Sequence, residues 1–132
     1  MNIDPIITNY FHAWLEKDCD KFLRTLGAGF YARESTGDVY EGIDVARDWF
    51  EGWHRGDNQV LNWTIESAWK LENRWFLTWT FTCKYDKVIT TFKGMTHLRM
   101  KDNKIIELNE YSQEFENKYP YGRPMNVSNE TS

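Results

Sequence analysis

An α+β fold is predicted, with helices packed on one face of a curved antiparallel sheet. Up to about residue 53, apolar residues recur at the spacing of helices, interrupted by one short predicted hairpin. From residue 60 onward they alternate with polar residues in the two-residue period of strands. Helices and long strands segregated in this way along a chain are typical of the α+β class, in which helices cover one face of the sheet.

Two helices are expected at the N-terminus. The first covers residues 5–17, because Asp4 can accept hydrogen bonds from the first free amide groups and proline suits the first helical position. The second covers residues 19–26 and should end at a left-handed glycine, either Gly27 or Gly29.

A hairpin, a third helix and four long strands complete the predicted order. The hairpin spans residues 30–40, the third helix spans residues 43–53, and the long strands begin near residues 60, 75, 88 and 104. On the first long strand, one face is predicted to carry Leu61, Trp63, Ile65, Ser67 and Trp69. On the second long strand, one face is predicted to carry Trp75, Leu77, Trp79, Phe81 and Cys83.

Composition argues against several classes of partner. The formal net charge is −4 with both signs scattered, so no basic stripe is present to bind nucleic acid. No stretch approaches the about 20 apolar residues of a membrane helix, and no basic segment precedes an apolar run, so we expect a cytoplasmic protein without a membrane partner. Cys19 and Cys83 lie far apart and the histidines are not clustered, which predicts two free thiols and no metal site.

Several short motifs resemble one known family in their order and spacing. They are Tyr10-Phe11-x-Ala13-Trp14, Lys17-Asp18, Tyr40-Glu41-Gly42 before Ile43-Asp44, Gly94-Met95-Thr96-His97-Leu98-Arg99-Met100, Asn103-Lys104-Ile105 and Glu110-Tyr111. Together, over residues 5–116, they resemble the SnoaL-like branch of the nuclear transport factor 2-like superfamily. Each motif is weak alone, and the set is more specific for the fold than for an activity.

The resemblance implies a cystatin-like, cone-shaped and strongly curved sheet with three helices packed on its concave side. It also implies a homodimer formed through the outer face of the sheet. We expect one domain over residues 1–116 and a C-terminal tail over residues 117–132 whose end is flexible. On the last strand, the family's acidic pocket position falls on Glu110, which places Ile106, Leu108 and Glu110 inward and the residues between them outward.

Members of this family include polyketide cyclases, ketosteroid isomerases, epoxide hydrolases and non-catalytic binding modules. We therefore expect a chain that binds a small, flat hydrophobic molecule and acts as a cofactor-independent cyclase or isomerase. The alternative is a non-catalytic module for ligand binding or dimerisation. Epoxide hydrolase chemistry is not expected, because Trp79 and Phe81 stand near where those relatives carry an arginine and an aspartate.

Three residues are candidates for acid/base catalysis. Glu110 in an aromatic pocket would lose hydration, which raises the pKa of a carboxyl toward neutral pH; the alternative is a structural carboxylate. Tyr10 matches the tyrosine that polarises a carbonyl oxygen in ketosteroid isomerases, although it could simply pack in the core. Glu34 lies near the general base of the same enzymes, with a solvated strand-end charge as the alternative. Thr96 occupies the position of their second oxyanion donor.

The predicted ligand-binding wall is mostly aromatic, in a chain with 7 tryptophans. Its members are Trp14, Trp49, Trp53, Trp79, Phe81, Thr96 and Leu108. Some of Trp63, Trp69 and Trp75 are expected near the dimer face instead. His12 and His54 are expected to be exposed.

Overall fold

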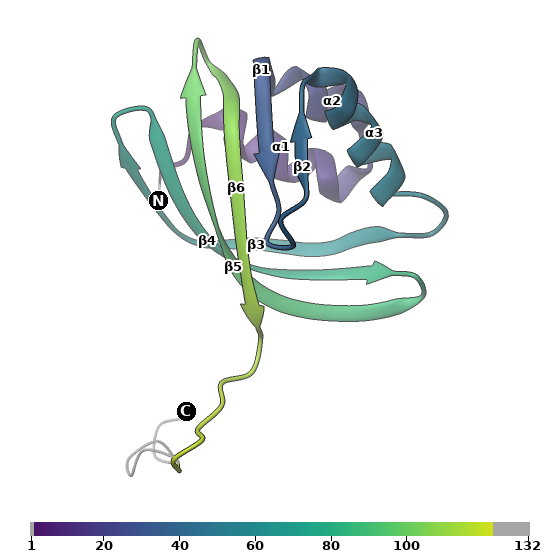
Figure 1. Cartoon of the computed structure of the whole chain (residues 1–132), viewed down its shortest axis with the longest axis vertical. Coiled ribbons are helices and arrows are strands. Elements are labelled where there is room, and N and C mark those ends of the chain that lie inside the picture. Colours follow the sequence, from purple (N-terminus) through teal and green to yellow (C-terminus); the bar gives the residue numbers. More distant parts are fainter. Residues whose placement is uncertain (1, 123–132) are drawn as a thin grey trace.

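The computed structural model describes residues 2–122, which contain three helices and a six-stranded sheet (Figure 1). In chain order the elements are α1 (Pro5–Glu16), α2 (Cys19–Arg24), β1 (Leu26–Arg33), β2 (Val39–Glu41), α3 (Ile43–Trp53), β3 (Gln59–Leu71), β4 (Arg74–Tyr85), β5 (Val88–Lys101) and β6 (Lys104–Glu114). The predicted α+β class and the predicted number of helices are confirmed.

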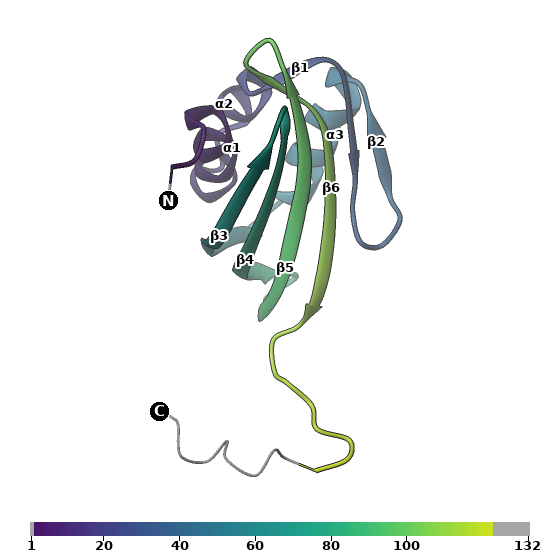
Figure 2. The same ribbon diagram turned by 90° about the vertical axis from the view of Figure 1, so that its left-hand side faces the viewer.

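The sheet is mixed, with the strand order β2-β1-β6-β5-β4-β3. β1 and β6 run parallel, and the other neighbouring strands run antiparallel. The predicted sheet was wholly antiparallel, so the β1–β6 pair corrects it. Figures 1 and 2 show the helices gathered on one side of the sheet and the long strands curving past them.

The first two helices begin where the sequence predicts. The Asp4 carboxylate accepts a hydrogen bond from the amide of Ile6 at 2.9 Å and opens α1. The predicted end of α2 was wrong, because both Gly27 and Gly29 lie within β1. A Cβ at Gly27 would lie 2.9 Å from Ile106 Cγ2, so this glycine permits close approach of β6. Gly29, with φ of +79°, sits where the β1–β6 register shifts.

Strand β4 alternates as predicted, with Trp75, Leu77 and Trp79 buried. Strand β3 does not, because its pairing with β4 shifts register between Val60 and Asn62 and again between Ile65 and Ser67. Each extra residue reverses which face the following side chains occupy. Leu61 is therefore exposed, against prediction, and Trp69 lies on the outer face.

A bulge also corrects the start of β6. Its pairing with β5 shifts between Arg99 and Met100, so that Ile105 rather than Ile106 enters the core. Beyond the bulge, the predicted alternation holds, since Leu108 is fully buried and Tyr111 is 53% exposed. Glu110 pairs with the buried Thr96 and shares its inward face.

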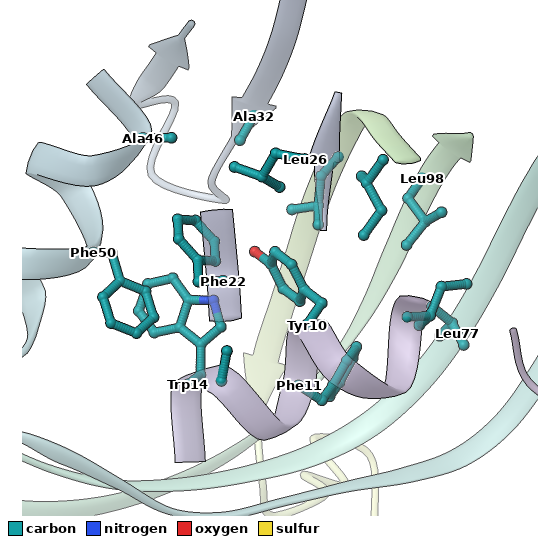
Figure 3. Packing of buried hydrophobic residues seen from close by; sticks show 14 of the residues in the cluster. Tyr10, Phe11, Trp14, Phe22, Leu26, Ala32, Ala46, Phe50, Leu77 and Leu98 are labelled. Carbon is teal, nitrogen blue, oxygen red and sulfur yellow. The ribbon is translucent and has the colours of Figure 1, made fainter. Parts of the chain in front are cut away.

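The core is built largely from aromatic rings. Figure 3 shows Tyr10, Trp14, Phe22 and Phe50 packed together between the helices and the sheet. Trp75, one of three tryptophans of which some were expected near the dimer face, is buried as well.

The expectation that His54 is exposed is wrong. His54 lies at the C-terminal end of α3 and is buried against α1. Its Nδ1 is 2.8 Å from the carbonyl oxygen of Phe50, and its Nε2 is 3.1 Å from the carbonyl oxygen of Trp14. Burial lowers the pKa of this imidazole, although the two backbone contacts partly oppose that effect. His54 therefore links the two helices.

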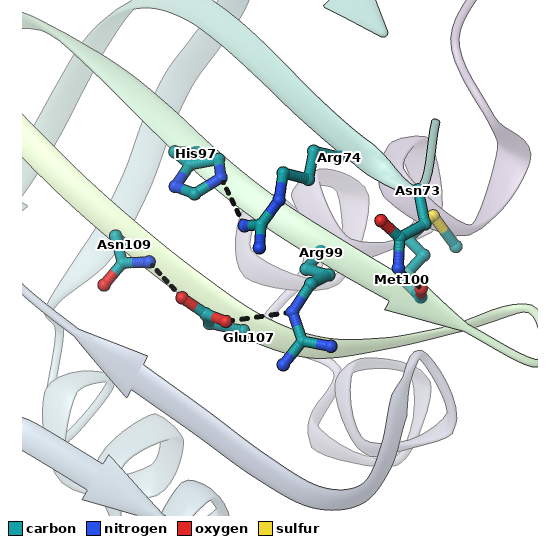
Figure 4. Close-up of polar contacts among 7 residues, drawn as sticks. All are labelled: Asn73, Arg74, His97, Arg99, Met100, Glu107 and Asn109. Carbon is teal, nitrogen blue, oxygen red and sulfur yellow. Dashed lines mark hydrogen bonds and ion pairs between the residues drawn. The ribbon is translucent and has the colours of Figure 1, made fainter. Parts of the chain in front are cut away.

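Polar contacts lie on the outer face of the sheet, where the last part of β5 pairs with the first part of β6 (Figure 4). Arg99 Nε donates to Glu107 at 3.1 Å, and the Asn109 amide donates to the same carboxylate at 3.0 Å. The His97 ring stacks on Phe76 with centroids 4.8 Å apart. His97 is thus on the outer face, as the alternation with Thr96 predicts.

The described part of the tail, residues 117–122, has no helix or strand. Tyr121 is 99% exposed there. The predicted flexible end of the tail concerns residues 123–132, which lie outside the described range.

The register of β5 can be tested by truncating one buried side chain. Leu98→Ala should lower the free energy of unfolding by about 2–5 kcal/mol, because Leu98 is fully buried and its loss leaves a cavity. Ile89→Ala on the same strand is the matched control, since Ile89 is 65% exposed and should cost less than about 0.5 kcal/mol. Urea unfolding of the two variants measures the difference, and similar costs would contradict the assigned faces.

Candidate functional site

A hollow of about 90 Å³ lies between the helices and the concave face of the sheet. We call it the aromatic cavity. Its lining residues are Trp14, Glu34, Trp49, Trp53, Trp63, Trp79, Phe81, Phe92 and Glu110. The cavity is smaller than the roughly 300–1,000 Å³ typical of sites for drug-sized ligands, so it suits a compact ligand.

Parallel pairing brings the two carboxyl groups to this cavity. Ala32 of β1 pairs with Leu108 of β6, and Arg33 pairs with Asn109. Glu110 is the next residue of β6, and Glu34 follows directly after the end of β1, whose strand lies about 4.8 Å from β6. Both side chains therefore point to the same face, although they are 76 positions apart in the sequence.

Both carboxyls are less acidic than usual. Loss of hydration, followed by repulsion from Glu34, raises the pKa of Glu110 to about 8. Loss of hydration also raises the pKa of Glu34, and repulsion from Asp38 adds to this, while contacts with Tyr40 and Trp49 oppose it. The Tyr40 hydroxyl donates to Glu34 Oε1 at 2.9 Å. At neutral pH, Glu110 therefore carries a proton.

Tyr10 lies beside the cavity rather than on its wall. Its side chain is 1% exposed, and its hydroxyl points toward Trp14 and Phe22 (Figure 3). Burial, then the nearby charge of Glu110, raises the pKa of this phenol, which keeps it protonated. Tyr10 is thus close enough to Glu110 to sense its charge.

Trp79 of β4 forms part of the wall. Its indole N–H donates to the hydroxyl of Thr96 at 2.8 Å, which fixes the ring orientation. Gly94 pairs with Trp79 on the neighbouring strand, and a Cβ there would lie 2.3 Å from the Trp79 ring. Glycine at this position therefore makes room for the tryptophan ring.

Buried donors on or beside the wall of the aromatic cavity are not fully satisfied. Among the described residues, the indole N–H of Trp63 has no hydrogen-bond partner. The Tyr10 hydroxyl and the indole N–H groups of Trp14 and Trp49 lack a partner in good geometry, although Trp14 interacts with Tyr10 and Trp49 with Glu34 and each contact lowers the pKa of its partner. An unmet buried donor costs about 1–3 kcal/mol, so such groups normally contact water or a ligand. The cavity can therefore offer a hydrogen bond to an oxygen acceptor.

The predicted site residues fall into two groups. Glu110, Glu34 and five predicted aromatic residues line the cavity, and these aromatics are Trp14, Trp49, Trp53, Trp79 and Phe81. Tyr10, Thr96 and Leu108 are buried near it without lining it. Their roles in catalysis or ligand binding stay predictions.

Sequence reasoning missed Trp63 and Phe92 as wall residues. Trp63 was among three tryptophans of which some were expected near the dimer face, but it pairs with Phe81 and shares its inward face. Phe92 could have been found from the two-residue period, because it is four residues from the inward Thr96 and pairs with Phe81.

Residues 2–122 contain no group of three or more histidine, cysteine, aspartate or glutamate side chains placed to hold a metal ion. No helix within the same range is both long and apolar enough to cross a membrane. Cys19 and Cys83 are free thiols, as predicted.

The raised pKa of Glu110 predicts how the free energy of unfolding depends on pH. An unfolded chain loses this proton near the ordinary value of 4.5, whereas the folded chain holds it to about pH 8. Stability should therefore fall as pH rises from about 5 to 8. Glu110→Gln should match the wild type at pH 5 and exceed its free energy of unfolding by about 1–3 kcal/mol at pH 9.

Urea unfolding of both proteins at pH 5, 7 and 9 measures this effect. Glu114→Gln is the matched control, because Glu114 is an exposed carboxylate on the same strand. Equal pH dependence in wild type and Glu110→Gln would show that Glu110 titrates normally.

Several solved structures share this fold. A ketosteroid isomerase-like protein from Catenulispora acidiphila, in complex with trimethylamine, superposes with a TM-score of 0.75 at 15% identity, over 83% of this chain and 86% of its own. An LEH-like epoxide hydrolase from M. tuberculosis superposes with a TM-score of 0.75 at 12% identity, over 83% of this chain and 81% of its own. A candidate SnoaL-like polyketide cyclase from Shewanella putrefaciens superposes with a TM-score of 0.73 at 13% identity, over 82% of this chain and 87% of its own. At these identities the likeness shows the fold alone.

The comparison with curated proteins finds no match. The sequence profile of the SnoaL-like domain matches residues 7–108, which confirms the resemblance found in the motifs. The chain therefore belongs to the SnoaL-like domain family of the nuclear transport factor 2-like superfamily.

Proposed function

We propose that this protein binds a compact organic molecule in the aromatic cavity and catalyses proton transfer on it without a cofactor, as in an isomerase or cyclase. One observation carries the proposal: Glu34 and Glu110 line the same apolar cavity, and both have a raised pKa. Pairs of carboxyls whose surroundings push their pKa values apart are typical of acid/base sites.

The two carboxyls suit opposite roles. Glu110 holds a proton at neutral pH and can donate it to a carbonyl oxygen of the ligand. Glu34, whose charge raises the pKa of Glu110, can accept a proton from the carbon beside that carbonyl when it is ionised. A ketone with a neighbouring C=C bond then becomes a dienol. Glu34 returns its proton to the far carbon of the dienol, and the O–H proton goes back to Glu110, which leaves an isomerised ketone and restores both carboxyls. The indole N–H of Trp63, which lines the cavity and has no partner among the described residues, is suited to stabilise the charge that develops on the oxygen.

A binding module without catalysis is the second candidate. The small volume of the cavity and its almost entirely aromatic wall favour it, because both features select a ligand by shape. In this case the two carboxyls would orient the ligand rather than exchange protons with it.

Hydrogen–deuterium exchange separates these two functions without knowledge of the natural substrate. Small ketones that bind the protein are incubated in D₂O, and loss of the proton next to the carbonyl is followed by NMR. The wild type should accelerate this exchange, and Glu110→Gln and Glu34→Gln should each slow it by about 100-fold or more.

Glu114→Gln, which alters an exposed carboxylate of β6, should leave the exchange rate unchanged. If ketones bind but exchange no faster than in buffer, the protein is a binding module. If the Glu110 and Glu34 variants exchange as fast as the wild type, the acid/base assignment is wrong.

We also propose that two copies associate through the outer face of the sheet. Trp69 and Tyr111 on that face are 58% and 53% exposed, so their rings are available to a partner. Light scattering should give the mass of a dimer at micromolar concentration, and Trp69→Glu should shift it toward the monomer. A monomeric wild type would contradict the proposal.

A further inference from the structure

The charge on the wall of the aromatic cavity has one sign. Two of the nine lining residues are carboxylic acids, and the other seven are tryptophan or phenylalanine. No lysine, arginine or histidine is among them. The faces of aromatic rings carry partial negative charge, so they add to the potential of an ionised carboxylate.

The rings of the wall lie in several planes, and some pairs meet at steep angles. Trp63 and Trp79 meet at 89° with centroids 5.6 Å apart, and Trp63 and Phe81 meet at 82° with centroids 5.1 Å apart. On the helical side, Trp14 and Trp53 meet at 80° with centroids 5.8 Å apart. Several rings in different planes around one small space are the arrangement that binds alkylated ammonium groups.

A shallow surface hollow next to the cavity is acidic too. It shares Glu34, Trp49 and Trp53 with the cavity and adds Asp38 and Asp48. No basic residue is among those that line it. This second hollow would raise the local concentration of cations at the cavity mouth and lower that of anions.

We propose that the aromatic cavity selects a compact alkylammonium cation that also carries an oxygen acceptor. This inference rests on the proposed function, because it assigns a ligand class to the same cavity. The alkyl groups contact the ring faces, and the positive charge is balanced by the Glu34 carboxylate. The oxygen accepts a hydrogen bond from the indole N–H of Trp63, which lines the cavity and has no partner among the described residues.

The proposal gives binding a pH dependence of known sign. Protonation of Glu34 or Glu110 removes negative charge from the cavity, so affinity for a permanent cation should rise with pH. Glu34 on the β1 side and Tyr10 from α1 act on Glu110. Arg33 and Tyr111 line a separate hollow that Glu110 also borders. Tyr40 and Asp38 act on Glu34 from β2 and its turn.

A matched pair of ligands tests the role of charge. Choline and 3,3-dimethylbutan-1-ol have nearly the same shape, but the first carries a quaternary ammonium and the second is neutral. Calorimetry should show choline binding at least tenfold more tightly at pH 8. Tetramethylammonium should also bind, and at least tenfold more tightly at pH 9 than at pH 6.

Variants of one wall residue test the role of the rings. Trp53 is half-buried, so its replacement should allow folding, which circular dichroism checks. Trp53→Phe keeps a ring and should weaken choline binding only slightly, whereas Trp53→Leu should weaken it at least fivefold. Trp69→Leu, on the outer face, is the control and should bind choline as the wild type does. Glu34→Gln gives a second test that leaves every ring in place, and it should weaken choline binding at least fivefold.

Equal affinities for choline and its neutral analogue would overturn the inference, as would no binding of either cation at millimolar concentration. The proposed function would survive that result if neutral ketones still exchanged deuterium in a reaction that needs Glu110. Cation binding without such exchange would instead support this ligand class while overturning catalysis.

Discussion

The site depends on the parallel pairing of β1 with β6. This register sets Ala32 beside Leu108, so that the next inward residue on each strand is a glutamate. A shift of one residue in β6 would turn Glu110 to the outer face and bring Asn109 or Tyr111 inward. The hydrophobic core resists such a shift, because Leu108 would leave the core with it. Packing of the core thus fixes the chemistry of the cavity.

Surroundings, rather than residue type, decide how each glutamate behaves. Glu107 and Glu110 are on the same strand but face opposite sides of the sheet. Partial burial raises the pKa of Glu107, but hydrogen bonds from Asn109 and Arg99 outweigh it, and the pKa is lowered overall. At Glu110, burial among rings and the nearby Glu34 both raise the pKa. The outer face therefore holds a structural ion pair, while the inner face holds a group able to exchange a proton.

The fold class, the helices and most of the aromatic wall could be predicted from the sequence, because they follow regular periods. Strand β4 shows this best, since Trp75, Leu77, Trp79 and Phe81 keep one phase along its whole length. Bulges could not be predicted, because an inserted residue reverses the faces without a change in composition. Leu61 and Ile106 were misplaced for this reason. The burial of His54 depends on the contact of α3 with α1, which a single helix period does not contain.

The residues of the aromatic cavity also lower the stability of the fold. Two acids in an apolar space destabilise the fold at neutral pH, and buried donors that are poorly satisfied among the described residues, Trp63 above all, add to the cost. Glutamine or leucine at Glu110 would relieve much of this strain with little change in shape. A chain selected for stability alone would not be expected to keep a raised-pKa carboxyl beside unmet donors. Such local conflicts are typical of functional sites, where stability is exchanged for reactivity or binding.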